Sequence, residues 1–179
     1  DKNNHSDSQL NVVRRALQAA ERPVIVMGSG TMIQPQLAVS LAEALTHLNV
    51  PIYLSGMARG LLGKNSSIQM RHNRKDALKK ADVVILAGVP CDFRMDYGRH
   101  ISSKSKYIGI NNSREDLFKN KNPNIAILTD PAQFMIDLSK GYKPANYIEW
   151  KRELHLREAA KEIQIDQQSY EAANGINPI

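Results

Sequence analysis

The sequence is poor in cysteine, since Cys91 is the only one among 179 residues. A single cysteine excludes an internal disulfide and any zinc site built from cysteines. Ten glycines and eight prolines are too few for a low-complexity or collagen-like chain. The longest apolar runs, such as Val83–Val89, are far shorter than the roughly 20 residues of a membrane-spanning helix. The first residues are polar and carry no signal-like segment, so the sequence does not indicate a compartment.

Aromatic residues are also few, and the ten present do not alternate with basic residues as the stacking platforms of nucleic-acid-binding proteins do. Lysine and arginine number 24 against 18 aspartates and glutamates, a net charge of +6 that suits an anionic ligand. We therefore expect no nucleic-acid partner. With 42% hydrophobic and 23% charged residues, the composition is that of an ordinary globular domain that can bury a core.

Short apolar runs alternate with stretches of helical periodicity. The expected helices run from a cap at Ser8 to Glu21, from Pro35 to Leu48, from a cap at Asn73 to Ala81, and from Asp130-Pro131 to Lys140. Continuously apolar strands between helices indicate parallel pairing with both faces of the sheet covered. The predicted fold is therefore α/β, a doubly wound, mostly parallel sheet. The expected strands are Val24–Met27, Val50–Leu54, Val83–Ala87, Lys106–Ile110 and Ile125–Leu128.

This pattern of helices and strands divides the chain into three segments. Residues 1–9 are interpreted as a leader, residues 10–141 as the α/β domain, and residues 142–179 as a connector with a charged helix over Ile148–Tyr170. The apolar positions of that helix are sparse, so it either straps across the sheet or reaches toward another domain. They are Trp150, Leu154, Ala159 and Ile163.

A glycine turn, Gly28-Ser29-Gly30, follows the first strand. Glycines there allow the backbone to approach a phosphate, whose charge the N-terminus of a following helix would favour. The third glycine of a dinucleotide fingerprint would fall at Ile33, and no acidic residue follows the second strand at Leu54-Ser55. An ordinary NAD-binding unit is therefore disfavoured, and a plain strand-to-helix turn is the alternative.

Basic residues gather in and beside the loop after the second strand: Arg59, Arg71, His72 and Arg74. Guanidinium groups at the carboxyl end of a parallel strand suit a phosphate, and a solvated basic loop is the alternative. The turn from Gly88 to Arg94 ends the next strand, and its Cys91 is interpreted as a packed thiol. The five histidines show no metal-like spacing. No catalytic residue and no metal ligand are assigned.

Three motifs carry a resemblance to a known family: Arg22–Gly30, Gly56–Gly63 and Asn73–Gly88. Together they resemble the central domain of thiamine-diphosphate-dependent enzymes over roughly Leu10 to Lys140. Within that family the motifs look most like acetolactate-synthase-like and 2-hydroxyacyl-CoA lyase-like proteins. The resemblance implies a Rossmann-like central domain with helices on both faces of its sheet, similar to FAD- and NAD-binding domains.

The resemblance also implies a function for the parent protein, a lyase or transferase that forms or cleaves a carbon–carbon bond next to a carbonyl. Thiamine diphosphate and magnesium would be held by flanking pyrimidine- and diphosphate-binding domains, in a homodimer or homotetramer. This domain would bind FAD or the ADP part of CoA and bridge those two domains, and alone it would be inactive. The alternative is a non-catalytic assembly module with a vestigial nucleotide site.

Carried over by the resemblance, one nucleotide site is expected at the ends of the strands. Asn111 stands where many members have an aspartate that holds the ribose, and Thr129-Asp130 stands in place of a Gly-Asp pair against the adenine. Phosphates are expected near Gly30 and Arg74, and the adenosine near Asn111 and Asp130, all in one cleft. The candidate cofactor-binding residues are Gly28, Ser29, Gly30, Arg74, Gly88, Asn111 and Asp130.

Overall fold

The computed structural model describes residues 5–174, which form one parallel sheet with helices around it. The six strands lie in the order β3-β2-β1-β4-β5-β6, which confirms the doubly wound α/β fold. The strands are β1 (Pro23–Met27), β2 (Ile52–Leu54), β3 (Gln69–Met70), β4 (Val83–Ala87), β5 (Lys106–Asn111) and β6 (Ile125–Leu128). Five of them were expected. The edge strand β3 was missed because two residues are too short to show a period.

The centre of the sheet is the pair β1 and β4, which run parallel with Ile25 opposite Ile85. Every residue of both strands is buried, as expected of continuous apolar runs covered on both faces. The chain proceeds from β1 outward to β2 and β3, then crosses back to β4. Strand order therefore reverses between β1 and β4, and ligands of open α/β sheets bind beyond the carboxyl ends of strands at such a point.

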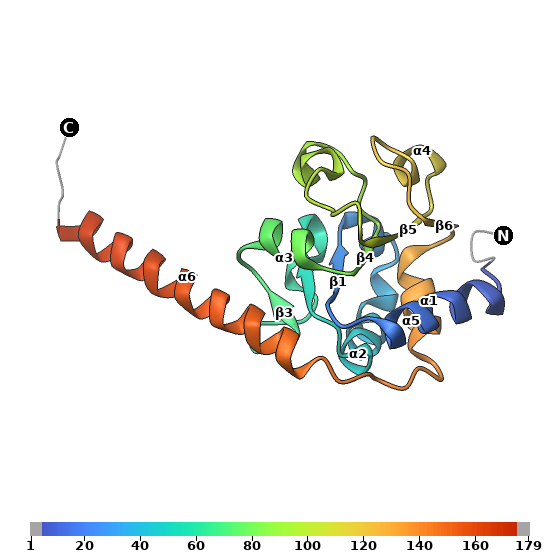
Figure 1. Ribbon diagram of the computed structural model, residues 1–179, viewed down its shortest axis with the longest axis horizontal. Helices are drawn as coiled ribbons and strands as arrows, with labels where there is room; N and C mark the ends of the chain where they lie inside the picture. Colours follow the sequence, from blue (N-terminus) through green and yellow to red (C-terminus); the bar gives the residue numbers. More distant parts are fainter. Residues whose placement is uncertain (1–4, 175–179) are drawn as a thin grey trace.

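Residues 5–174 form six α-helices, of which the last extends away from the sheet. α5 packs against both α1 and α2, and Figure 1 shows these three helices gathered together. In the same view α4 lies at the top, after the carboxyl end of β5. Within residues 5–174 no helix combines the length and apolarity that crossing a bilayer would take. The helices are α1 (Asp7–Ala19), α2 (Ala38–Leu48), α3 (Arg74–Lys80), α4 (Arg114–Leu117), α5 (Pro131–Ser139) and α6 (Ile148–Asn174). Short 3₁₀ segments are η1 (Ser29–Met32), η2 (Pro35–Leu37), η3 (Gly56–Gly60) and η4 (Phe93–Gly98).

The first helix starts earlier than the sequence suggested. Ser6, not Ser8, is the N-cap of α1, because Gln9 three residues later completes a reciprocal capping box with it. The preceding His5 is packed against the domain: its Nε2 lies 3.1 Å from Asp137 Oδ2 and its Nδ1 lies 3.2 Å from Thr129 Oγ1. Residues 5–9 therefore belong to the ordered structure, and residues 1–4 of the expected leader lie outside the described residues.

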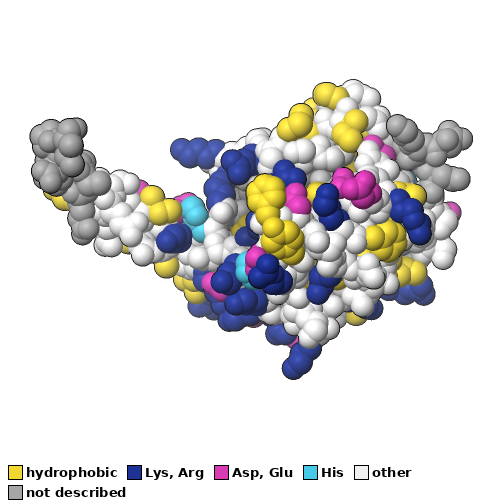
Figure 2. Space-filling model, turned by 90° about the horizontal axis from the view of Figure 1, so that it is seen from above, with side chains coloured by type: hydrophobic (Ala, Val, Ile, Leu, Met, Phe, Trp, Pro, Cys, Tyr) yellow, Lys and Arg dark blue, Asp and Glu magenta, His cyan; other side chains and the backbone are white. Residues whose placement is uncertain are grey.

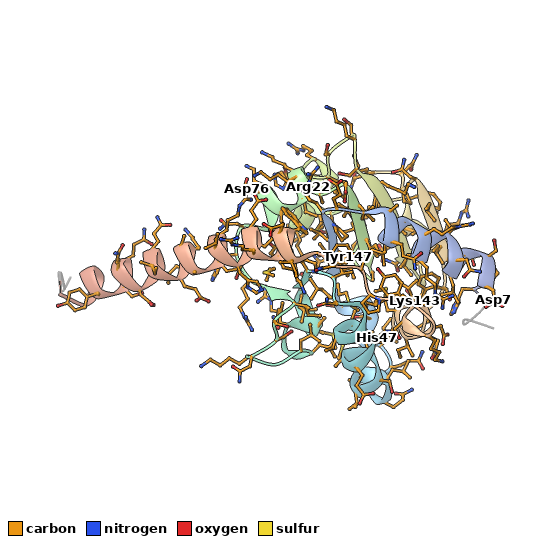
Figure 3. The ribbon with its side chains drawn as sticks, turned by 60° about the horizontal axis from the view of Figure 1, so that its bottom comes forward. Asp7, Arg22, His47, Asp76, Lys143 and Tyr147 are labelled. Atoms are coloured by element: carbon orange, nitrogen blue, oxygen red, sulfur yellow. The ribbon has the colours of Figure 1, made fainter. Side chains whose placement is uncertain are left out.

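The connector between α5 and α6 is tied to the domain by side chains. The Tyr147 hydroxyl donates to the carbonyl oxygen of Leu17 at 2.7 Å and lies 3.0 Å from the hydroxyl of Tyr142. His47 Nε2 on α2 lies 3.0 Å from the carbonyl oxygen of Tyr142. Figure 3 shows the labelled Tyr147 at the base of α6, with His47 and Lys143 nearby on α2 and the connector. The root of α6 is thus held against α1 and α2.

The last helix runs beside β3 and then projects away from the rest of the molecule (Figure 1). Its buried positions are Trp150, Leu154 and Glu158, each one helical turn apart. Ala159 and Ile163, two of the expected apolar contacts, are exposed instead. The difference arises because the third buried position is a glutamate, which hydrophobic periodicity cannot identify.

Candidate functional site

Two adjoining clefts open near the carboxyl ends of the strands. The larger, with a volume of about 850 Å³, is called the arginine cleft after its cations Arg59, Arg71, Arg74, Lys75 and Arg94. The smaller, of about 300 Å³, is called the glycine cleft after Gly28, Gly30 and Gly88. Ser55 and Arg94 line both, so the two clefts are neighbours. Figure 2 views the molecule from above and shows Lys and Arg side chains interspersed with hydrophobic ones on this face.

Arg74 begins α3 and reaches across the arginine cleft. Its Nη2 donates to the carbonyl oxygen of Arg94 at 2.6 Å, which connects α3 with η4. Burial lowers the pKa of the Arg74 guanidinium, and the positive charge of Arg59 lowers it further. Two guanidinium groups that repel each other across a cleft form a site whose charge an anionic ligand would offset.

The other cations of the arginine cleft come from several elements. Arg94 forms hydrogen bonds with the carboxylate of Asp92, and Arg71 donates to the carbonyl oxygens of Gly63 and Lys64. These partners orient the guanidinium groups without removing their charge. The one carboxylate of the cleft is Asp96, whose Oδ2 lies 3.1 Å from His100 Nε2.

The arginine cleft also has a neutral polar lining. Tyr53 and Gln69 come from the neighbouring strands β2 and β3 and are both buried. Burial raises the pKa of the Tyr53 hydroxyl, so this group stays a neutral phenol. Gln69 Oε1 is buried and has no hydrogen-bond partner among the described residues. A buried amide oxygen without a partner is costly, which makes Gln69 a candidate ligand contact.

The glycines of the glycine cleft bring the turn after β1 against the turn after β4. The N–H of Gly28 donates to the carbonyl of Ala87 at 3.1 Å, and the N–H of Gly30 donates to the carbonyl of Gly88 at 3.2 Å. The segment that follows is the 3₁₀ turn η1, and the next α-helix starts only at Ala38. Those two amides are therefore already paired, and the turn leads into a short 3₁₀ segment rather than directly into an α-helix. The glycines permit a close approach of two turns.

Asn111 and Asp130 come from adjacent strand ends, since the N–H of Thr129 donates to the carbonyl oxygen of Asn111 at 2.9 Å, but their side chains have different partners. Asn111 ends β5 and lines the glycine cleft, where its Oδ1 accepts the N–H of Ser113 at 3.2 Å. Asp130 lines neither cleft. Its carboxylate caps α5 by accepting the N–H of Gln133 at 2.8 Å and also accepts Nε2 of Gln34 at 3.0 Å. An aspartate before Pro131 at the first helical position is a strong N-cap signal, and this local role accounts for its burial.

The expected site residues are distributed over these two adjoining clefts, which share Ser55 and Arg94. Gly28, Ser29, Gly30, Gly88 and Asn111 line the glycine cleft, whereas Arg74 lines the arginine cleft. Arg59 and Arg71 of the basic loop join Arg74 as expected, but His72 does not line either cleft. Residues that the sequence analysis did not assign to the site include Gln69, Lys75, Arg94, His100 and Lys119.

Two features of the turn after β4 complete the site. Cys91 is buried, its Sγ lies 3.6 Å from the Tyr107 hydroxyl, and burial raises the pKa of its thiol. This agrees with a packed thiol rather than a nucleophile. In η4, Asp96 and Tyr97 both have left-handed backbone conformations with φ of 46° and 55°. Such strain is sustained only where the surrounding structure enforces it, here at the rim of the arginine cleft.

Residues 10–138 match the family described as thiamine pyrophosphate enzyme, central domain. The chain is 43% identical to 2-hydroxyacyl-CoA lyase 2 of Danio rerio over 142 residues, which cover 77% of the chain and 23% of that protein. It is 38% identical to 2-hydroxyacyl-CoA lyase 2 of Homo sapiens over 180 residues, which cover 97% of the chain and 28% of that protein. The chain therefore spans about a quarter of the length of these relatives.

More distant similarity extends to synthases and decarboxylases. An acetolactate synthase large subunit of Mycobacterium tuberculosis is 32% identical over 92 residues, which cover 51% of the chain and 17% of that protein. Among solved structures, a thiamine diphosphate-dependent 4-hydroxybenzoylformate decarboxylase of Rhodococcus jostii superposes with a TM-score of 0.62. That match has 14% identity and covers 79% of this chain and 28% of the decarboxylase chain, so it supports the fold alone.

Proposed function

The chain belongs to the thiamine pyrophosphate enzyme central-domain family, of the acetolactate synthase and 2-hydroxyacyl-CoA lyase type, and we propose on this premise that its two clefts bind an adenine nucleotide. The nucleotide is the ADP part of FAD or of CoA. The observation that supports the proposal is the adjacency of the clefts, in which a cation-lined space of about 850 Å³ shares Ser55 and Arg94 with a smaller space beside Asn111.

The charges determine the orientation of the nucleotide. Phosphates belong in the arginine cleft, where Arg59, Arg74 and Lys75 can pair with them. This keeps the expected position of the phosphates near Arg74 and assigns them no bond to the amides of Gly28 and Gly30, which are already paired. The adenosine belongs in the glycine cleft, where the Asn111 amide can form hydrogen bonds with a ribose hydroxyl.

We infer the wider role of this domain from the domain organisation expected of its longer parent protein. We place residues 10–141 as the central domain and residues 142–179 as the connector toward a diphosphate-binding domain. In the parent, thiamine diphosphate and magnesium would be held by the flanking pyrimidine- and diphosphate-binding domains, which this domain bridges. The parent would form or cleave a carbon–carbon bond next to a carbonyl, as a homodimer or homotetramer. The 179-residue chain on its own is expected to show no lyase or synthase turnover with added thiamine diphosphate and magnesium.

The proposal is tested by calorimetric titration of the chain with ADP, CoA, FAD and NAD, together with a thermal-unfolding series. A ligand at 100 times its dissociation constant stabilises a protein by about 2.7 kcal/mol. We expect ADP and CoA or FAD to raise the unfolding temperature and NAD to have a smaller effect. Binding should weaken as salt increases, because exposed charges are screened. No binding by any of the four would contradict the proposal.

A structural module with a vestigial site is the second candidate function. Two observations favour it: the amides of Gly28 and Gly30 are taken by β4 and its turn, and Asp130 serves as a helix cap. In that case the arginine cleft would contact an acidic surface of a neighbouring domain. A flat titration with all four ligands would support this candidate.

A further inference from the structure

A third polar cluster lies outside both clefts, near the point where α6 leaves the rest of the molecule. It consists of His72, Glu158 and Glu162, and one ligand atom from each lies within 4.8 Å of the others. Glu158 and Glu162 are four residues apart on α6, so they lie on the same face of the helix. His72 comes from the turn between β3 and α3. The cluster therefore joins two segments that are distant in the sequence.

Glu158 is held in place by the backbone of that turn. Its exposed fraction is 9%. Its Oε2 accepts the N–H of Arg71 at 2.9 Å, and its Oε1 accepts the N–H of His72 at 2.6 Å. A carboxylate has about four lone-pair sites, so two bonds leave capacity for another ligand. The carboxylate is thus both buried and oriented, as outer-shell hydrogen bonds orient the carboxylate ligands of metal sites.

The other two members carry no competing partner within residues 5–174. The His72 imidazole, which is partly buried, forms no hydrogen bond or ion pair there, and neither does the exposed Glu162 carboxylate. The nearby cations of α6 are engaged elsewhere, since Arg157 donates to Glu153 and Lys161 donates to Gln164. Two carboxylates one turn apart on a helix repel each other. A divalent cation bound between the two carboxylates would offset this repulsion.

We propose that His72, Glu158 and Glu162 form a binding site for a divalent transition-metal ion of the zinc class. One imidazole nitrogen and two carboxylate oxygens are donors that such ions accept, whereas magnesium and calcium prefer oxygen alone. Donors around a tetrahedral ion are about 3.4 Å apart at bond lengths near 2.1 Å. Small rotations of the His72 and Glu162 side chains would therefore complete the set, and water would fill the remaining positions. The bound ion would fasten α6 to the turn beside Arg71 and Arg74.

Cobalt absorbance and zinc calorimetry on the untagged 179-residue chain test the site. We expect one equivalent of Co²⁺ to produce ligand-field bands that Zn²⁺ displaces, and Zn²⁺ to raise the unfolding temperature. His72→Ala and Glu162→Gln should weaken zinc binding at least about tenfold. Binding should also weaken as the imidazole is protonated at acid pH. The matched controls are His155→Ala and Glu149→Gln, on the same helix but outside the cluster, which should bind zinc like the parent.

Circular dichroism checks that each variant folds, and Glu162→Gln is the decisive variant because this side chain is exposed and supports no other contact. The site is refuted if zinc does not saturate near one equivalent or if His72→Ala and Glu162→Gln bind as the parent does. Equal stabilisation by Mg²⁺ would refute the assignment to the zinc class. None of these measurements depends on nucleotide binding, so they stand apart from the proposed function.

Discussion

Gly30 and Gly88 each occupy the space that a side chain on the other would need. The N–H of Gly30 donates to the carbonyl of Gly88 at 3.2 Å. A Cβ built on Gly30 would lie 2.8 Å from Gly88 Cα, and one built on Gly88 would lie 2.7 Å from the backbone nitrogen of Thr31. These neighbours are backbone atoms, so no flexible side chain can move aside. The contact joins the carboxyl ends of β1 and β4, where strand order reverses.

Gly30→Ala and Gly88→Ala are therefore expected to destabilise the domain. Overpacking a tight site costs about 1–3 kcal/mol. Gly88 also has a φ of +63°, which adds about 1–3 kcal/mol for a residue with a side chain. Urea denaturation followed by circular dichroism should show a lower midpoint for both variants than for the parent. The midpoint of Gly88→Ala should be lower than that of Gly30→Ala.

Two other glycines distinguish the steric cost of an added Cβ from the cost of a positive φ. A Cβ on Gly60 meets nothing within 4 Å, so Gly60→Ala should leave the midpoint unchanged or slightly higher. Gly63 is equally open but has a φ of +72°, so Gly63→Ala should show the backbone cost alone. A midpoint for Gly88→Ala equal to that of Gly60→Ala would contradict the steric argument.

Arg74→Ala tests the position of the phosphates. The loss of one hydrogen bond to a charged group should weaken ADP binding by about 1.5–3 kcal/mol, measured by calorimetry. Because Arg74 also donates to Arg94, the urea midpoint is measured alongside, and Arg74→Lys should recover part of the affinity through its charge. Arg15→Ala, an exposed position on α1, serves as the control. Unchanged ADP affinity in a folded Arg74→Ala variant would contradict the placement of the phosphates in the arginine cleft.

The ion pair of Asp92 and Arg94 predicts a stability loss in acid. Hydrogen bonds from Arg94 hold the pKa of Asp92 below its ordinary value. Because the folded-state pKa is depressed, the stability from this pair is present above about pH 3.9, the ordinary aspartate value. It is lost as pH falls through the lower pKa of the folded protein.

Asp92→Asn should therefore lower stability at neutral pH and reduce the further loss in acid. The check is a series of urea midpoints from neutral to acid pH for the parent and the variant. Asp166→Asn, at an exposed position of α6, should follow the parent curve. Parallel curves of urea midpoint against pH for the parent and Asp92→Asn would show that the pair contributes nothing to the stability loss in acid.

Trp150 anchors α6 and is the one tryptophan of the chain. Its side chain is buried, and its Nε1 donates to the carbonyl oxygen of Pro23 at 3.0 Å. Trp150→Phe should cost about 1–3 kcal/mol, because the Pro23 carbonyl is left without its donor. Urea denaturation followed by circular dichroism measures the change. Leu156→Ala, on the exposed side of the same helix, should stay within about 0.5 kcal/mol of the parent.

The long apolar strands and the Asp130-Pro131 helix start were predictable from sequence because each has a local signal. The strand β3 and the buried Glu158 were not, since a two-residue edge strand has no period and a charged residue on a buried face breaks the pattern. The glycine turn was located from sequence but its role was left open, because a close approach to a phosphate and a close approach of two backbones both require a missing Cβ.

The residues of the arginine cleft were also only partly predictable from local sequence. Arg59, Arg71 and Arg74 were grouped because they follow one another along the chain. Arg94 reaches the cleft from the turn after β4, on the opposite side of β1 in the sheet. Only the crossover from β3 back to β4 brings it to Arg74, and that neighbourhood depends on tertiary structure rather than on local sequence.

Because α6 projects from the domain, a small change in angle at its base moves its far end by a larger distance. Among residues 148–170 its last buried position is Glu158, and the helix runs on to Asn174, which at 1.5 Å per residue leaves an arm of about 24 Å. A tilt of about 10° at the root would displace the far end by about 4 Å for an arm of this length. Small repacking around Trp150 is therefore amplified at Asn174, so the direction of the helix is set by a few side chains at its base.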